Sequence, residues 1–458
     1  MNFTFLSASI SDLLLMILAS IVILSYVFSV YSKRTGIPSV LLLIGLGIAV
    51  GLFGNYFETF SFDKYKSILD PLLIILGTVG LVLIVLEAAL DLKLLKEKVG
   101  LITRSFFVGL IGLVGTSLSA AWFISYFLEG MSILDGLLIT IPLSVLSSAI
   151  ILPSIDDLGE EKKEFMIYES TFSDILGILG FGFLVGSETF FKEASAFQIS
   201  GSIVGEVLYT VLFSGIISYV LIYLFQKLKD HGKLFLLIAV LVFLYALGHM
   251  VEVASLMVIL IFGMILNNYP VFFRGKLKNF VIEDRVNSIL EDFKVVTIES
   301  AFVVRTFFFI IFGWSIAIGS LLDFRVWLFG VPIIGIIYLV RIITLYIFNG
   351  TIKIKKVVPM LFLAPRGLIT ILLFYQVKDK IIALTPEFLG KKIDFEGVLL
   401  LVILFSCLIM SWALVKEKRI VSIKQNEDFE ILDGKGGGED PIKKEGEESI
   451  SDSSESVN

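Results

Sequence analysis

Two carboxylates occur within one apolar stretch of the chain, where residues 169–174 read Glu-Ser-Thr-Phe-Ser-Asp. In a helix, Glu169 and Ser173 lie on one face, while Ser170 and Asp174 lie on the adjoining face. The acids and hydroxyls therefore form one polar stripe, whose oxygens suit a small hard cation. A charge at the centre of a bilayer costs about 2.5 to 3.5 kcal/mol, so buried acids usually serve ion or proton transport. We expect Asp174 to bind ions and Glu169 to form a structural ion pair with another helix.

The composition predicts an all-α membrane protein. Of the 458 residues, 57% are hydrophobic and 17% are charged, and the mean hydropathy is +0.94. One cysteine, Cys407, and two histidines, His231 and His249, provide neither a disulfide nor the spacing of a metal site. The chain also lacks the glycine-rich motifs that bind nucleotide phosphates. We therefore expect a transporter in a lipid bilayer, not an enzyme, with no cofactor and no nucleic-acid partner.

Apolar stretches long enough to cross a bilayer recur along the chain. We predict thirteen spans, at about 10–31, 38–54, 71–90, 105–128, 132–155, 165–187, 200–226, 234–249, 251–267, 295–319, 326–349, 357–376 and 397–415. Basic residues gather in alternate loops, from Lys33 and Arg34 to Lys353, Lys355 and Lys356. The positive-inside rule then places the amino terminus outside the cell membrane and the carboxyl terminus in the cytoplasm.

The end of the chain differs from the rest in composition. After Trp412 the apolar pattern stops, and residues 416–458 become acidic and rich in glycine. Such a segment has too few apolar residues to build a core. We expect a transmembrane domain of residues 1–415 followed by a disordered cytoplasmic tail of residues 416–458.

Proline and glycine interrupt two of the predicted spans. Pro142 and Pro153 lie in the fifth span, and Pro365-Arg366-Gly367 lies in the twelfth. A broken helix frees backbone groups, which a membrane tolerates only where protein or water satisfies them. Arg366 would lie at such a break and would neutralise the carbonyl ends of opposed half helices. A kink that only packs would leave the buried charge of Arg366 unexplained.

These motifs together resemble the monovalent cation:proton antiporters, specifically the NhaP-like branch that includes sodium/proton exchangers. Five motifs carry the resemblance: the Pro- and Gly-rich second span (Ile37-Pro38 to Gly47), the acidic third span (Leu86-Glu87-Ala88-Ala89-Leu90-Asp91), Glu169-Ser170 with Ser173-Asp174, Leu339-Val340-Arg341, and Pro365-Arg366-Gly367.

The resemblance implies a fold and an assembly. The fold would be an inverted repeat with two broken, crossing helices, spans five and twelve. A core would comprise residues of about 105–187 and 326–415, and a dimerisation domain would comprise about 10–90 and 200–319. The protein would be a homodimer.

The resemblance also implies roles for individual residues. Asp174 would be the carboxylate that binds either the cation or a proton, with Ser170 and Glu87 contributing nearby. Arg341 would form the core ion pair with Glu169, and Arg366 would lie beside the helix crossing.

The chain departs from the family's pattern at two places. The break of span five lacks the usual Thr-Asp-Pro, so Ser147 or Ser148 would offer a hydroxyl and freed carbonyls there. This pair of serines looks somewhat like the potassium/proton exchangers of the sister branch. Ser173 replaces the usual Asn before Asp174, and a hydroxyl adds no carboxylate. One carboxylate suggests that one proton is exchanged for one cation.

We therefore expect electroneutral antiport of a monovalent cation against H+ by alternating access, with both ions competing for one carboxylate. Na+ is favoured over Li+ and K+. Two alternatives stay open at this point, a K+/H+ antiporter and a pH-gated cation channel or sensor on the same fold. Glu299 and Arg305, on predicted span ten, have no role in the family, and we expect them to pair in the buried interior.

Overall fold

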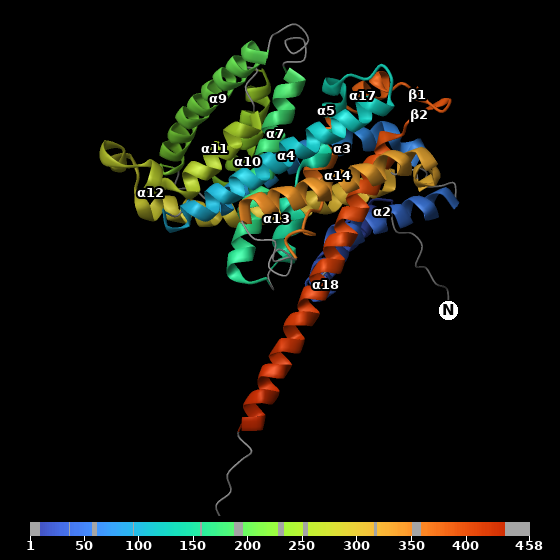
Figure 1. The fold of residues 1–458 in the computed structure, drawn as a ribbon. Helices are drawn as coiled ribbons and strands as arrows, with labels where there is room; N and C mark the ends of the chain where they lie inside the picture. Colours follow the sequence, from blue (N-terminus) through green and yellow to red (C-terminus); the bar gives the residue numbers. More distant parts are fainter. Residues whose placement is uncertain are drawn as a thin grey trace, which may run out of the picture. The chain divides into compact units, whose positions relative to one another are not determined.

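The computed structural model describes residues 10–435 except for 36, 57–61, 95, 156–157, 187–195, 228–232, 251–254, 316–317 and 350–358. The chain divides into two compact units, Met1–Val415 and Lys416–Asn458. The described part of the first unit is helical except for one hairpin, formed by β1 (Glu387–Phe388) and β2 (Lys391–Lys392), and for connecting segments (Figure 1).

The helices follow the apolar stretches of the sequence, because a helix satisfies its own backbone hydrogen bonds in hydrocarbon. Their bounds are α1 (Ile10–Thr35), α2 (Ser39–Tyr56), α3 (Phe62–Asp91), α4 (Val99–Phe127), α5 (Ile133–Ser144), α6 (Ser148–Ile151), α7 (Glu160–Gly186), α9 (Ala196–Phe225), α10 (Lys233–Met250), α11 (Ser255–Asn267), α12 (Tyr269–Phe272), α13 (Glu283–Ser315), α14 (Phe324–Asn349), α16 (Leu368–Gln376), α17 (Lys378–Leu384) and α18 (Phe395–Lys435).

Each of the thirteen predicted stretches contains described helix, although residues 145–147 of the fifth stretch and 359–367 of the twelfth are not helical. Among the described residues, eight helices are long and apolar enough to cross a membrane, and Ser39–Leu52 and Leu256–Asn267 are shorter apolar helices. The predicted all-α membrane fold is therefore confirmed, whereas the number of thirteen spans stays a prediction.

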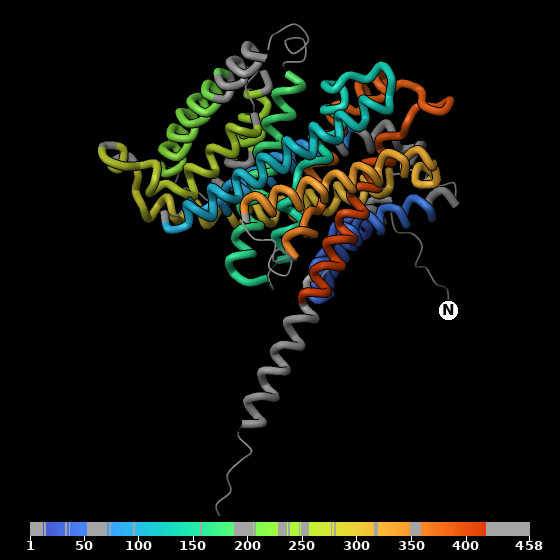
Figure 2. The backbone as a smooth tube through the Cα atoms, in the orientation of Figure 1, coloured from blue at the N-terminus to red at the C-terminus, as the bar shows by residue number. Residues whose placement is uncertain are grey.

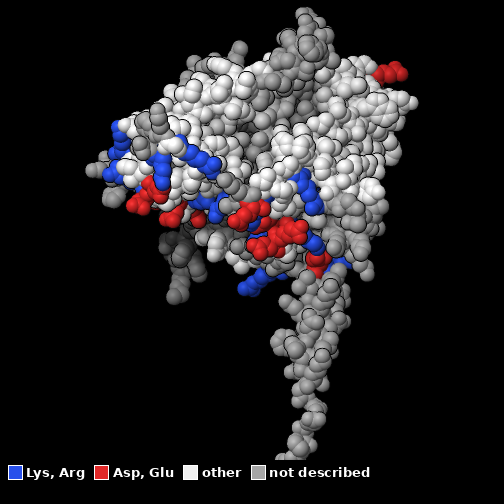
Figure 3. Space-filling model, turned by 60° about the vertical axis from the view of Figure 1, so that its left-hand side comes forward, with Lys and Arg blue, Asp and Glu red and all other residues white. Residues whose placement is uncertain are grey.

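The surface carries charge in a restricted zone. On the face drawn in Figure 3, acidic and basic side chains form a band along the lower edge, and the surface above it is nearly free of charge. Large apolar or aromatic side chains are well exposed on several helices, with Trp122, Tyr126 and Ile216 between 61% and 68% exposed. An apolar surface of this extent suits contact with lipid.

Each of the two broken helices belongs to a group of three segments. The first comprises α4, the interrupted pair α5 and α6, and α7, and α4 packs against both α5 and α7. The second comprises α14, the irregular segment before α16 with α16 itself, and α18. Figure 2 shows α4 and α14 running side by side, and the two helices are in contact. The α13 helix packs against α2 and α3, and α11 packs against α3 and α9.

The predicted tail begins as helix. The α18 helix continues to Lys435, through the first twenty residues of the segment that we expected to be disordered. No proline or glycine occurs between Lys416 and Asp433, so nothing in the local sequence stops the helix before Gly434. Residues 436–458 lie outside the described residues.

Glycine residues allow the backbones of α2 and α13 to approach each other closely. A Cβ atom at Gly47 would collide with the carbonyl oxygen of Ile310 and would lie 2.9 Å from Gly313 Cα. A Cβ atom at Gly313 would likewise collide with the backbone of Ile44. These collisions involve backbone atoms, which cannot rotate away as a side chain can. The crossing therefore requires glycine on both helices.

We expect Gly47→Ala to destabilise the protein by about 1 to 3 kcal/mol, the usual cost of overpacking. The measurement is thermal unfolding of the detergent-solubilised protein. Gly45→Ala is the matched control, because no atom lies within 4 Å of a Cβ at Gly45 and alanine favours helix. Equal melting temperatures for the two variants would contradict the tight crossing.

Candidate functional site

The two broken segments cross and bind one another. The α5 helix ends at Ser144, Val145 and Ser147 have extended backbones, and α6 begins at Ser148. The Ser147 backbone N–H donates to the carbonyl oxygen of Pro365 at 3.0 Å, in the irregular segment before α16. A Cβ atom at Gly367 would collide with the Ser147 side chain, so glycine allows this approach. Segments far apart in the sequence thus satisfy each other's freed backbone groups.

Asp174 lies at this crossing, on α7, and is only 3% exposed. Ser148 donates two hydrogen bonds to Asp174 Oδ2, one from its hydroxyl and one from its backbone N–H at 3.3 Å. Among the described residues, Asp174 Oδ1 has no hydrogen-bond partner. Ser173 accepts a hydrogen bond from the Leu146 backbone N–H at 3.0 Å. Neighbouring side chains of α7 therefore satisfy two amides of the break, and one carboxylate oxygen stays available.

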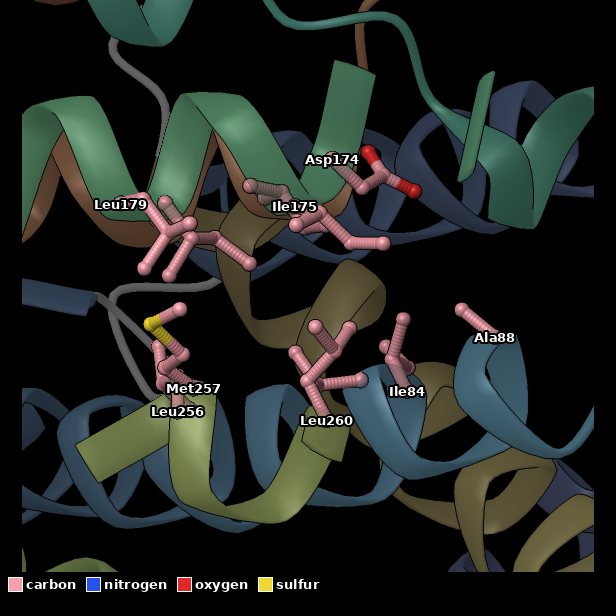
Figure 4. A pocket seen from close by; sticks show the side chains of 11 residues that line it. Ile84, Ala88, Asp174, Ile175, Leu179, Leu256, Met257 and Leu260 are labelled. Carbon is pink, nitrogen blue, oxygen red and sulfur yellow. The ribbon is translucent and has the colours of Figure 1, made fainter. Parts of the chain in front are cut away.

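Asp174 borders a narrow apolar crevice. In Figure 4, Asp174 lies beside Ile175 of α7, across the crevice from Leu260 of α11 and from Ile84 and Ala88 of α3. Of the described residues that line the crevice, Asp174 alone is ionisable. The space open to water is about 10 Å³, which is near the size of one water molecule. A hydrated cation does not fit in this conformation, so an ion here must exchange its water shell for protein oxygens.

Glu169 and Arg341 form a bidentate ion pair, as expected. Arg341 Nη1 and Nη2 donate to the two carboxylate oxygens at 2.7 and 3.2 Å, and both residues are buried, with Arg341 6% and Glu169 1% exposed. Arg341 Nε and Nη2 also donate to the Met360 carbonyl oxygen at 3.0 and 2.7 Å. The pair therefore ties α7 to α14 and to the segment that leads into the second break.

Arg366 lies beside the crossing and is 3% exposed. Its backbone N–H donates to Ser406 Oγ at 3.0 Å, whereas its side-chain Nε and Nη1 have no partner among the described residues. It lines a second small cavity with Ser144, the last residue of α5, and with Ser173 and Arg341. The carbonyls at the end of a helix carry partial negative charge, which compensates a nearby cation.

Ser170 and Glu87 are directed to partners other than Asp174. The Ser170 hydroxyl donates to the Met166 carbonyl oxygen one turn back on its own helix, at 2.7 Å. Glu87 Oε1 accepts from Arg305 Nη2 at 3.5 Å, across the contact of α3 with α13, and Glu87 does not line the Asp174 crevice. Their contribution to ion binding, inferred from the resemblance, stays a prediction.

The expected pair of Glu299 with Arg305 is wrong, because Arg305 contacts Glu87 and the side chain of Glu299 is exposed. Residues six apart on a helix lie about 9 Å apart along its axis and about 120° apart around it, so these two side chains point in different directions. Sequence analysis missed Arg305 as the partner of Glu87. An arginine within an apolar span signals the need for an acid, but only packing decides which neighbouring helix supplies it.

Removing one member of the buried pair should be costly. We expect Glu169→Gln to destabilise the protein by about 3 to 5 kcal/mol, because Arg341 would keep an uncompensated buried charge. Thermal unfolding in detergent measures this loss. Glu283→Gln is the control, since the Lys278–Glu283 pair is 71% and 62% exposed and should contribute little. Similar stabilities of the two variants would show that the buried pair does not hold α7.

Comparison with known proteins places these features in a family. A family model described as "Sodium/hydrogen exchanger, transmembrane" matches residues 17–416. The structure of the sodium proton antiporter MjNhaP1 from Methanocaldococcus jannaschii at pH 8 superposes with a TM-score of 0.65 at 18% identity, covering 88% of this chain and 97% of that one. An electron-microscopy map of the same antiporter gives 0.56 at 17% identity, covering 90% and 97%. No curated protein matches the chain.

The structural likeness establishes the antiporter fold, with its two broken, crossing segments. The family model covers most of the sequence and includes every residue of the crossing. The chain therefore belongs to the sodium/hydrogen exchanger family of membrane transporters.

Proposed function

We propose that the protein exchanges Na+ for H+ across the cell membrane, with Asp174 as the group that binds either ion. The observation that carries this proposal is the asymmetry of the Asp174 carboxylate. Ser148 binds one oxygen, whereas the other has no donor among the described residues, and Asp174 lines the crevice. An unsatisfied carboxylate oxygen is costly when buried, and either a proton or a cation can relieve that cost.

The exchange is electroneutral in this proposal. Asp174 is the one ionisable residue among the described residues that line the crevice, and Glu87, next to Ala88 on α3, is paired with Arg305. Binding of one cation would then release one proton, and the site would be neutral with either ion bound. Moving the empty, charged carboxylate through the membrane would be disfavoured, and this difference couples the two fluxes.

Alternating access would bring the site to each side in turn. A second, larger cavity, with about 360 Å³ open to water, lies between α3, α13 and α16 and is lined by Thr78, Gln376 and Asp379. Ile369 of α16 lines the crevice, and Ile371 of the same helix lines the cavity. The two spaces are therefore neighbours along α16. In this conformation the crevice itself is nearly closed, which favours an exchanger over a continuously open channel.

Other parts of the proposal follow from the family and from loop charge. The core of about 105–187 and 326–415 would move against a dimerisation domain of about 10–90 and 200–319 in a homodimer. The amino terminus would lie outside and the carboxyl terminus in the cytoplasm. K+ is the second candidate cation, because Ser147 and Ser148 occupy the break where the sodium branch has an acid.

Loss of the Asp174 charge should abolish exchange. Vesicles that contain the protein, a pH gradient and a lumenal dye are given Na+, Li+ or K+ in turn. We expect Na+ to collapse the gradient with wild type, and Asp174→Asn to match protein-free vesicles, because an amide neither releases a proton nor neutralises a cation. The amide oxygen can still accept from Ser148, so the variant should fold.

Asp284→Asn serves as the matched control, since this acid is exposed in the first turn of α13. Wild-type rates in Asp174→Asn would show that Asp174 is structural. A response to K+ alone would identify a K+/H+ antiporter, and gradient loss without any added cation would indicate uncoupled proton conduction.

Electroneutral exchange should be insensitive to voltage. We expect the initial rate of Na+/H+ exchange to be the same with a potassium diffusion potential of either sign and with none. One positive charge crossing 100 mV corresponds to about 2.3 kcal/mol, so electrogenic exchange would respond strongly. A clear rate change that reverses with the sign of the potential would require a second titrating group, for which Glu87 is the first candidate.

A further inference from the structure

The first part of the connection between α3 and α4, residues 92–94, is fixed to the end of α11. Asn268 is 5% exposed, and its Oδ1 accepts from the Leu94 backbone N–H at 2.7 Å while its Nδ2 donates to the Leu92 carbonyl oxygen at 2.7 Å. Asn267 Nδ2 donates to the same carbonyl oxygen at 3.0 Å. Three hydrogen bonds from two neighbouring side chains therefore hold this connection in place.

The helix that carries Asp174 binds the same connection more weakly. Tyr168, six residues before Asp174 on α7, donates from its hydroxyl to the Lys93 carbonyl oxygen at 2.8 Å. One turn earlier on α7, Glu164 pairs with Lys98, directly before α4. Among the described residues, the Tyr168 hydrogen bond thus joins α7 to residues 92–94, and the Lys98–Glu164 pair joins α7 to the end of the connection.

The order of features along α3 shows where this link acts. Gly77 and Leu81 line the larger cavity, Ile84 and Ala88 line the Asp174 crevice, and Leu92 follows the end of the helix. Since a helix rises 1.5 Å per residue, Leu92 lies about 16 Å beyond Leu81 along the axis of α3. The larger cavity and the connection therefore lie on opposite sides of the crevice.

We propose that Tyr168 is a positioning residue of the transport cycle, whose hydrogen bond to Lys93 latches α7 and keeps the Asp174 crevice closed on the side of the α3–α4 connection. This inference rests on the proposed function, in which α7 moves relative to α3 and α11. One hydrogen bond between neutral groups is weak enough to break in each cycle. Asn267 and Asn268 hold residues 92–94 by three bonds, and the Lys98–Glu164 pair joins α7 to the start of α4, against which α7 packs, so it is the Tyr168 bond that gives way.

The test measures access to the crevice from each side of the membrane. Ala88→Cys places a reporter thiol in the crevice, and the native Cys407 is buried, so labelling reports position 88. Full-length protein in vesicles is treated with a membrane-impermeant maleimide from outside or inside. Glu97 is exposed beside the connection, so labelling of a separate Glu97→Cys variant identifies the side of the membrane on which the connection lies.

Tyr168→Phe removes the hydroxyl and keeps the ring. Combined with Ala88→Cys, we expect it to raise labelling at position 88 from the connection side about five-fold, the effect of one lost hydrogen bond, with no rise from the other side. Tyr219→Phe is the matched control, because its hydroxyl donates to the Phe272 carbonyl oxygen at 3.1 Å away from α7. This control should label as the Ala88→Cys protein does.

Unchanged labelling in Tyr168→Phe, or an equal rise in Tyr219→Phe, would overturn the latch. Labelling does not require ion transport, so it separates the two proposals. If Tyr168→Phe changes access but no cation dissipates a pH gradient, the exchanger proposal fails and the latch stands. If exchange depends on Asp174 but access is unchanged, the latch fails and the exchanger proposal stands.

Discussion

The structure depends on one constraint, that irregular backbone inside a membrane must find hydrogen-bond partners within the protein. The two breaks meet this need partly through each other, by the bond from Ser147 to Pro365. The α7 helix supplies two further partners for the first break, through Ser173 and the carboxylate of Asp174, and Ser406 accepts from the Arg366 backbone in the second. The same arrangement positions Asp174 and leaves one of its oxygens available. The contacts that satisfy the backbone of the broken helix therefore also form the proposed ion site.

Charge inside the first unit is largely cancelled in pairs. Glu169 with Arg341 and Glu87 with Arg305 each join two helices, and each pair is formally neutral. Asp174 and Arg366 differ, because each is buried and each has side-chain polar atoms without partners among the described residues. Asp174 accepts from the first amide of α6, and Arg366 lines a cavity with the last residue of α5, so partial charges on backbone groups at the break offset both full charges. A proton or cation on Asp174 thus changes the charge of an otherwise balanced region.

The α7 helix connects the features that transport would need. It carries Glu169, which anchors it to α14, and Asp174, which lies at the crevice. It also carries Tyr168, which binds the connection after α3. These residues occupy two turns of one helix, so a displacement of the helix would affect them together. The α3 helix provides the opposing wall, from the larger cavity through the crevice to the connection.

The sequence by itself determined the helical class, the two breaks and the acids of α7, because apolar runs, prolines and buried charges act locally. It also indicated the pairing of Glu169 with Arg341, through family resemblance. Only tertiary structure decided that Arg305 meets Glu87 and that Ser148, with no acid in the break, holds Asp174. Those outcomes depend on which helices pack together and how they are rotated. Residue spacing fixes directions around a single helix, whereas a partner on another helix is fixed by packing.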